Sequence, residues 1–153
     1  MPFLEKLQSF YLSTHRIYAK QMTDDVLQIF GNLIHKMPNL QRLTLLSALL
    51  NSEQTEKLIN SVLTAPAIQS EIRYIRLSET LDMSSDAACE ALLDLINAPP
   101  KLKLFCMWDQ SEEEGSRQVS ILQENGKLTC TNKETGEVII SKDETQRKWS
   151  VII

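Results

Sequence analysis

Cysteine and histidine are the residue types in this chain best suited to nucleophilic, redox or metal chemistry. The three cysteines, Cys89, Cys106 and Cys130, are odd in number and far apart, and no C-x-x-C pair occurs. This spacing is typical of free thiols in a reducing compartment and favours neither a disulfide framework nor a zinc site. His15 and His35 have no sequence neighbour that completes a nucleophile–base pair. We therefore predict no metal site, and structural thiols rather than a Cys–His catalytic pair.

The sequence also lacks the common motifs that bind phosphates or activate water. G-x-x-x-x-G-K-[ST], G-x-G-x-x-G and H-E-x-x-H do not occur, and four glycines leave little for a phosphate cradle. A net charge of −4 and an isoelectric point near 5.2 argue against general nucleic-acid binding, which needs a basic surface. We expect no catalysis, no cofactor and no nucleic-acid partner.

The elements that position these residues are indicated by short leucine-rich segments that recur along the chain. Each segment has the pattern L-x-x-L-x-L with apolar exchanges, and each predicts a short strand. The first copy is aligned through the match of Met1-Pro2 with Met37-Pro38, which predicts a strand over residues 4–10. The copies are spaced by 36, 32 and 30 residues and open at Leu4, Leu40, Ile72 and Leu102.

Helical periodicity fills the intervals between the strands. Apolar residues recur three and four positions apart, and a proline follows each helical segment and prevents its continuation. The predicted N-caps are Thr23, Ser52 and Ser84, because a side-chain oxygen there accepts an orphan backbone N–H. The predicted helices cover residues 24–36, 52–65 and 84–98.

The unit of strand, loop, helix and proline is therefore predicted three times, followed by a fourth strand. Stacked units bury their strand leucines and helix stripes together. Helix-bearing units of about 30 residues resemble leucine-rich repeats of the ribonuclease-inhibitor-like class, over roughly residues 1–110. The resemblance implies a short α/β solenoid of parallel strands with helices on its convex side. The alternative is a doubly wound βαβ domain with leucine-rich strands.

The resemblance also implies a binding face, formed by strand residues that alternate with the inward leucines. The first two predicted outward ladders are Lys6, Arg42, Tyr74, Leu104 and Gln8, Thr44, Arg76, Cys106. The third is Phe10, Leu46, Ser78, Trp108, and the strand entrances carry Glu5, Gln41, Arg73 and Lys103.

Arginines and large aromatic residues on this face predict a protein-binding patch, because these types are enriched at interface hot spots. Its basic character on an acidic protein suggests an acidic segment on the partner. For Trp108 the alternative is a place under the C-terminal segment. We define the predicted patch as Arg42, Tyr74, Arg76, Lys103 and Trp108.

A change of period separates a second region, residues 111–153, from the repeats. The acidic link at the boundary, over residues 109–115, is expected to be solvated, with metal binding by the glutamates as the alternative. Asn125-Gly126 predicts a hairpin with a type I′ turn, and residues 137–141 and 148–153 predict two more strands of an antiparallel meander. We expect this meander to cap the open end of the solenoid, or else to carry its own contact.

The ends of the chain carry no address signal as written. A secretion signal and an apolar run of roughly 18 residues are missing, so we expect a cytoplasmic protein. The last four residues resemble a prenylation box, but Ser150 stands where the acceptor cysteine is required, so a membrane anchor is expected only if Ser150 replaces a natural cysteine. A ligand for carboxylate-capturing domains and a plain terminal strand are the alternatives.

These features favour a non-enzymatic module that binds a partner protein on its sheet face. We expect an adaptor-like protein, specifically a bacterial effector that acts in the host cytosol. The alternatives are a regulator of a small GTPase and a structural subunit of a larger assembly. In the last case the first strand, which no cap precedes, forms the joint.

Overall fold

The computed structural model describes residues 3–13, 23–46, 50–78, 81–108, 117–144 and 150–152. A parallel sheet contains β1 (Ser9–Ser13), β2 (Arg42–Leu46), β3 (Tyr74–Ser78), β4 (Leu104–Trp108) and β8 (Ser150–Ile152), in that order. A separate antiparallel sheet contains β5 (Val119–Glu124), β6 (Lys127–Asn132) and β7 (Val138–Asp143). The helices are α1 (Asp24–His35), α2 (Ser52–Leu63) and α3 (Asp86–Asn97), with short 3₁₀ helices η1 (Leu4–Lys6) and η3 (Pro66–Gln69).

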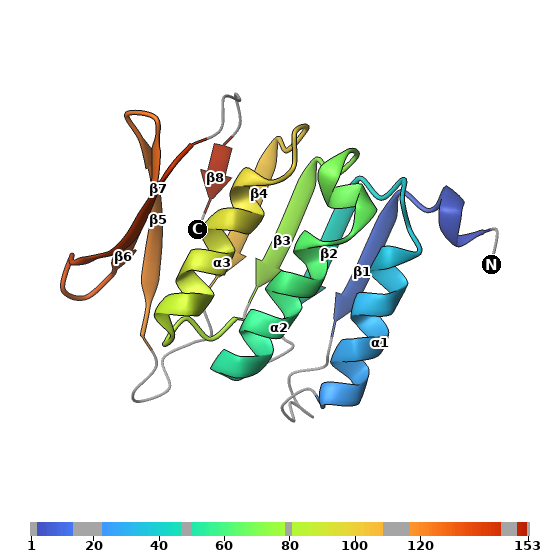
Figure 1. Cartoon of the computed structure of the whole chain (residues 1–153), viewed down its shortest axis with the longest axis horizontal. Coiled ribbons are helices and arrows are strands. Elements are labelled where there is room, and N and C mark those ends of the chain that lie inside the picture. Colours follow the sequence, from blue (N-terminus) through green and yellow to red (C-terminus); the bar gives the residue numbers. More distant parts are fainter. Residues whose placement is uncertain are drawn as a thin grey trace.

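The α/β class with two sheets is as predicted. The strands β1 to β4 follow one another in chain order, and α1, α2 and α3 lie side by side on one face of the parallel sheet (Figure 1). A doubly wound sheet would carry helices on both faces. The described helices therefore do not form the doubly wound alternative.

All three predicted helices are present, but two of the three predicted N-caps are wrong by one residue. Thr23 accepts from the Val26 N–H at 3.4 Å, as predicted. For α2 the cap is Asn51, because its side chain accepts from the Gln54 N–H at 2.8 Å. In turn, the Gln54 side chain accepts from the Asn51 N–H. This reciprocal capping box satisfies two orphan donors at once.

For α3 the cap is Ser85 and not Ser84. The Ser85 hydroxyl accepts from the Ala88 N–H at 3.3 Å. The hydroxyl of Ser84 instead donates to Asp82 at 2.6 Å, one step before the helix begins. Both corrections arise because the cap is set by where a side-chain oxygen reaches the third helical N–H.

The first strand was predicted over residues 4–10, but β1 covers Ser9–Ser13 and its register differs from the predicted one by three residues. Residues 4–6 form η1, and β1 pairs with β2 so that Phe10 lies opposite Leu43 and Leu12 opposite Leu45. The L-x-x-L-x-L pattern is thus Leu7-x-x-Phe10-x-Leu12 in the first copy. Phe10, predicted to point outward, packs edge-on against Phe30 of α1 with ring centroids 5.4 Å apart.

In this register the strands are spaced more evenly along the chain than in the sequence match. The residues that face one another across β1 to β4 are separated by 33, 32 and 30 positions along the chain. They are Phe10, Leu43, Ile75 and Phe105.

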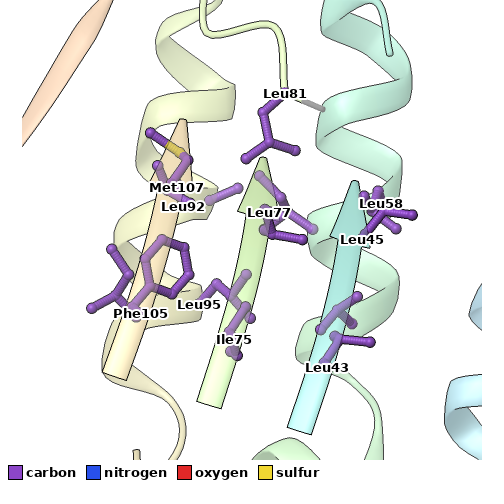
Figure 2. Close-up of a cluster of buried hydrophobic side chains, with 14 of the residues drawn as sticks. Leu43, Leu45, Leu58, Ile75, Leu77, Leu81, Leu92, Leu95, Phe105 and Met107 are labelled. Atoms are coloured by element: carbon purple, nitrogen blue, oxygen red, sulfur yellow. The ribbon is translucent and has the colours of Figure 1, made fainter. Parts of the chain in front are cut away.

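The main core lies between the parallel sheet and the helix row (Figure 2). Strand residues such as Leu45, Ile75 and Phe105 are at most 1% exposed, and helix residues Leu58 and Leu92 pack against them. Burying each such side chain contributes about 1.5–3 kcal/mol relative to exposure. This core fixes which side of each strand faces away from the helices.

The C-terminal region contains the predicted hairpin but divides its strands between two sheets. Asn125 and Gly126 have φ of 53° and 74°, which a type I′ turn requires. The last strand was predicted to join the antiparallel meander. Instead, β8 pairs in parallel with β4, with Ser150 opposite Leu104.

The antiparallel sheet packs on α3 and adds Val119, Ile121, Leu128 and Cys130 to the buried residues. Lys142 of β7 forms ion pairs with Glu90 at 3.2 Å and with Asp94 at 2.5 Å. Both carboxylates belong to α3. The two regions of the chain therefore share one core.

Candidate functional site

The face of the parallel sheet that is opposite the helices carries Arg42, Tyr74 and Arg76 of the predicted patch. On β2, Leu43 and Leu45 are buried, whereas Arg42, which precedes them, is exposed. Arg76 of β3 is exposed as well, between buried Ile75 and Leu77. Strand alternation therefore places both arginines on the outer face, as predicted.

Arg42 and Tyr74 are brought into direct contact by the pairing of β2 with β3. The two residues lie opposite each other, and the Arg42 guanidinium carbon is 4.5 Å from the centroid of the Tyr74 ring. A cation over an aromatic face is attracted by the ring quadrupole, with about 0.5–1 kcal/mol at exposed sites. The contact holds the guanidinium against the sheet before any partner arrives.

A depression of about 320 Å³ lies beside this pair. Arg42, Tyr74 and Arg76 supply its polar and aromatic wall, and Leu104 and Cys106 of β4 supply a less polar side. The complete lining is Arg42, Leu43, Thr44, Tyr74, Ile75, Arg76, Leu104 and Cys106.

A line of backbone hydrogen bonds extends the sheet at the strand entrances. The Arg73 N–H donates to the Gln41 carbonyl at 2.9 Å, and the Lys103 N–H donates to the Arg73 carbonyl at 2.8 Å. Lys103, a member of the predicted patch, is exposed at this border. In the first copy this position is occupied by Gln8 and not by the predicted Glu5. The Gln8 carbonyl accepts from the Gln41 N–H.

Trp108, the last member of the predicted patch, is placed only by its backbone. It pairs with Ser78 at the end of β4, and its side chain lies outside the described residues. The acidic link, His15 and residues 145–149 lie outside them too. The residues 150–152 of the prenylation-like tail form β8, as in the plain-strand alternative.

Tyr11 is an outer-face residue that the sequence reasoning missed. The register places it opposite Thr44, where Gln8 was predicted, and places Ser9 opposite Arg42, where Lys6 was predicted. The Tyr11 side chain is 65% exposed and extends the aromatic part of the face. The pattern Leu7-x-x-Phe10-x-Leu12 is the signal that identifies it.

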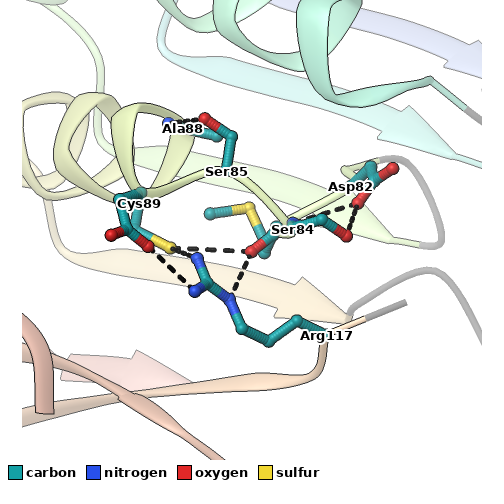
Figure 3. Close-up of polar contacts among 8 residues, drawn as sticks. Asp82, Ser84, Ser85, Ala88, Cys89 and Arg117 are labelled. Carbon is teal, nitrogen blue, oxygen red and sulfur yellow. Dashed lines mark hydrogen bonds and ion pairs between the residues drawn. The ribbon is translucent and has the colours of Figure 1, made fainter. Parts of the chain in front are cut away.

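A second polar constellation joins α3 to the segment before β5 (Figure 3). Arg117 Nε donates to the Met83 carbonyl at 2.9 Å, and its Nη1 donates to Asp86 at 2.8 Å. Its Nη2 lies 3.3 Å from the sulfur of Cys89, a fully buried thiol on α3. These three contacts fix the guanidinium at the boundary between the two regions.

The pKa of Cys89 is lowered from its usual value near 9.0, first by a hydrogen bond from the Cys130 thiol. The charge of Arg117 and its hydrogen bond lower this pKa further, whereas burial raises it. The pKa of Arg117 is raised: burial lowers it, but its bonds to Asp86 and Cys89 outweigh that effect. Folding thus shifts the ionisation of Cys89 toward lower pH.

Cys89 and Cys130 are both 0% exposed, so a substrate has no route to either sulfur. The described histidine, His35, lies elsewhere: its ring nitrogens are 2.8 Å from the Gly31 carbonyl and 2.9 Å from the Thr64 hydroxyl. A pair of Cys89 with His35 is therefore not formed.

Over the described ranges, no three His, Cys, Asp or Glu residues gather as ligands for a metal ion. No helix in that part of the chain is long and apolar enough to cross a bilayer. Comparison of the chain with protein-family models, with curated protein sequences and with solved structures gives no significant match.

Proposed function

We propose that this chain is a non-enzymatic protein-binding module that holds an acidic segment of its partner on the outer face of β2, β3 and β4. The observation that carries the proposal is the depression between Arg42, Tyr74 and Arg76. Guanidinium groups bind carboxylates in a bidentate manner, and an ordered arginine loses less conformational entropy on binding.

The charge of the face supports an acidic partner. The outward and entrance positions described on β1 to β4 include three arginines and a lysine and no acidic residue, in a protein of net charge −4. Such a segregated basic surface attracts an acidic segment of a partner.

The proposal includes membership of the leucine-rich-repeat proteins of the ribonuclease-inhibitor-like class. In-phase strands every 33, 32 and 30 residues and a helix row on one face support it. The outer face is the sheet surface that helices leave open for a partner. The cytoplasmic location and the role of a bacterial effector stay predictions, as does the role of a GTPase regulator.

The experiment compares two charge-reversed variants with the native chain. Arg42→Glu with Arg76→Glu changes the candidate site, and Lys127→Glu with Lys133→Glu makes the same change of charge on exposed residues of the antiparallel sheet. Proteins captured from lysate by the native chain and by the lysine variant, but not by the arginine variant, are identified by mass spectrometry.

The acidic segment of a captured protein is then titrated by fluorescence anisotropy. We expect the arginine variant to bind it at least about tenfold more weakly, a loss of about 1.4 kcal/mol, with an unchanged melting temperature. Added salt weakens binding of the native chain, because exposed charges are screened. Equal binding by both variants would reject the proposal.

A further inference from the structure

The flank of α1 that faces away from α2 is apolar, although α1 is the outermost helix of the row (Figure 1). Val26 and Ile29 are 45% and 58% exposed, and Leu33 is partly buried beside them. The opposite flank carries Asp24 and Gln28, which line a groove with α2. A terminal helix in water normally has its polar residues on the free flank.

Comparison of α1 with α2 indicates which kind of surface this flank contacts. When the sequences of α1 and α2 are aligned at their N-caps, Thr23 and Asn51, the residues Val26, Ile29 and Leu33 correspond to Gln54, Lys57 and Ser61 of α2. Those α2 residues face α1: Gln54 donates to Asp24 at 3.0 Å, and Lys57 and Ser61 line the groove between the two helices. The free flank of α1 is thus equivalent to the flank of α2 that contacts a neighbouring helix.

We propose that this flank binds a second copy of the chain, through antiparallel packing of α1 on its counterpart about a twofold axis. The axis passes beside the free flank, level with the midpoint between Ile29 and Leu33, so that Ile29 of one copy meets Leu33 of the other and the apolar stripe covers itself. A parallel twofold pair would instead set Asp25 against Asp25 and Lys36 against Lys36.

Charge complementarity favours the same orientation. Asp25 stands at the first turn of the stripe and Lys36 at its C-terminal end, so the antiparallel pair brings each Asp25 to the Lys36 of the other copy. Neither residue has an ion-pair partner within the described part of the chain. The two helix dipoles also oppose each other in this arrangement.

The dimer is weak and depends on concentration. A helix of 12 residues is about 18 Å long, and a pair of that length buries less than the roughly 1,200–2,000 Å² of a standard interface. The outer face of the sheet stays open in the dimer, so the inference is independent of the proposed function.

The test is sedimentation velocity over a wide range of protein concentration. We expect the native chain to pass from monomer to dimer, and Ile29→Glu to remain monomeric with an unchanged melting temperature. Gln28→Glu, on the flank that faces α2, is the matched control and is expected to dimerise. A native chain that is monomeric at every concentration overturns the proposal and assigns the flank to a different partner.

Charge reversal tests the antiparallel orientation. Asp25→Lys and Lys36→Asp are each expected to weaken the dimer at least about tenfold, because each opposes like charges twice in the symmetric pair. An equimolar mixture of the two variants pairs opposite charges again and restores dimer formation. If the mixture stays as weak as either variant, or if Ile29→Glu dimerises normally, the proposal is wrong.

Discussion

Arg117 shows how one side chain connects two regions of the chain. It makes three polar contacts, to Met83, Asp86 and Cys89, and only 23% of its side chain is exposed. A hydrogen bond that involves a charged, partly buried group contributes about 1.5–3 kcal/mol, and Asp86 is largely exposed, so its ion pair adds little. The contacts to the Met83 carbonyl and to Cys89 therefore dominate.

We predict that Arg117→Gln lowers the free energy of unfolding by about 1–3 kcal/mol and reduces its pH dependence. The folded pKa of Cys89 lies below its unfolded value near 9.0, so ionisation favours the folded state. In the native chain this contribution grows as pH rises through the folded pKa and is absent at lower pH. Urea unfolding at a series of pH values, with thiolate absorbance, measures both effects.

The control for this prediction is Cys89→Ser, which removes the titrating thiol. Its stability is expected to lack the rise with pH whatever its absolute value. If Arg117→Gln leaves both the pH dependence and the thiolate titration unchanged, the guanidinium does not influence Cys89.

At the scale of elements, the register of the first strand differs from the one predicted by the match of Met1-Pro2 with Met37-Pro38. Phe10 is partly buried against the core and Tyr11, its neighbour, is 65% exposed. We predict that Phe10→Ala destabilises the fold by about 2–3 kcal/mol, whereas Tyr11→Ala costs less than about 0.5 kcal/mol. Chemical denaturation of the two variants measures the difference, and the reverse order would restore the register predicted from the Met-Pro match.

The helices and the phase of β2 to β4 could be predicted because their signals are local. Apolar spacing identifies a helix or strand within a dozen residues, and the prolines bound each unit. From that phase, the outward positions Arg42, Tyr74 and Arg76 follow directly. The N-caps of α2 and α3 were missed by one residue because Ser52 and Ser84 are chemically suitable, and only the reach of the neighbouring oxygen decides.

Contacts between distant segments could not be predicted from the sequence. Arg117 and Cys89 are brought together by packing of the antiparallel sheet on α3, and no pattern in either segment encodes that contact. The pairing of β8 with β4 was missed for the same reason: a short apolar strand fits either sheet edge equally well. Likewise, alternation indicates that Arg42 and Tyr74 point outward, but their stacking depends on the parallel register.

For the whole molecule, the shared core predicts that the repeat region does not fold alone. A variant that ends at residue 110 lacks Val119, Ile121 and Leu128, which are at most 6% exposed. Each contributes about 1.5–3 kcal/mol, and the total stability of a domain is about 5–15 kcal/mol. We expect this variant to lose its cooperative thermal transition in calorimetry. A transition at the native temperature would show that the antiparallel sheet is only an appendage.

The constant register of β1 to β4 has a consequence for how such a chain changes over evolutionary time. Each strand receives hydrogen bonds on one edge and offers an equivalent set on the other, and each helix follows its strand on the same side. Duplication of one complete unit therefore lengthens the sheet without reversing the orientation of any side chain. Gain or loss of a single strand residue exchanges the inner and outer faces from that point on. Whole-unit insertion is thus the tolerated route to a wider outer face.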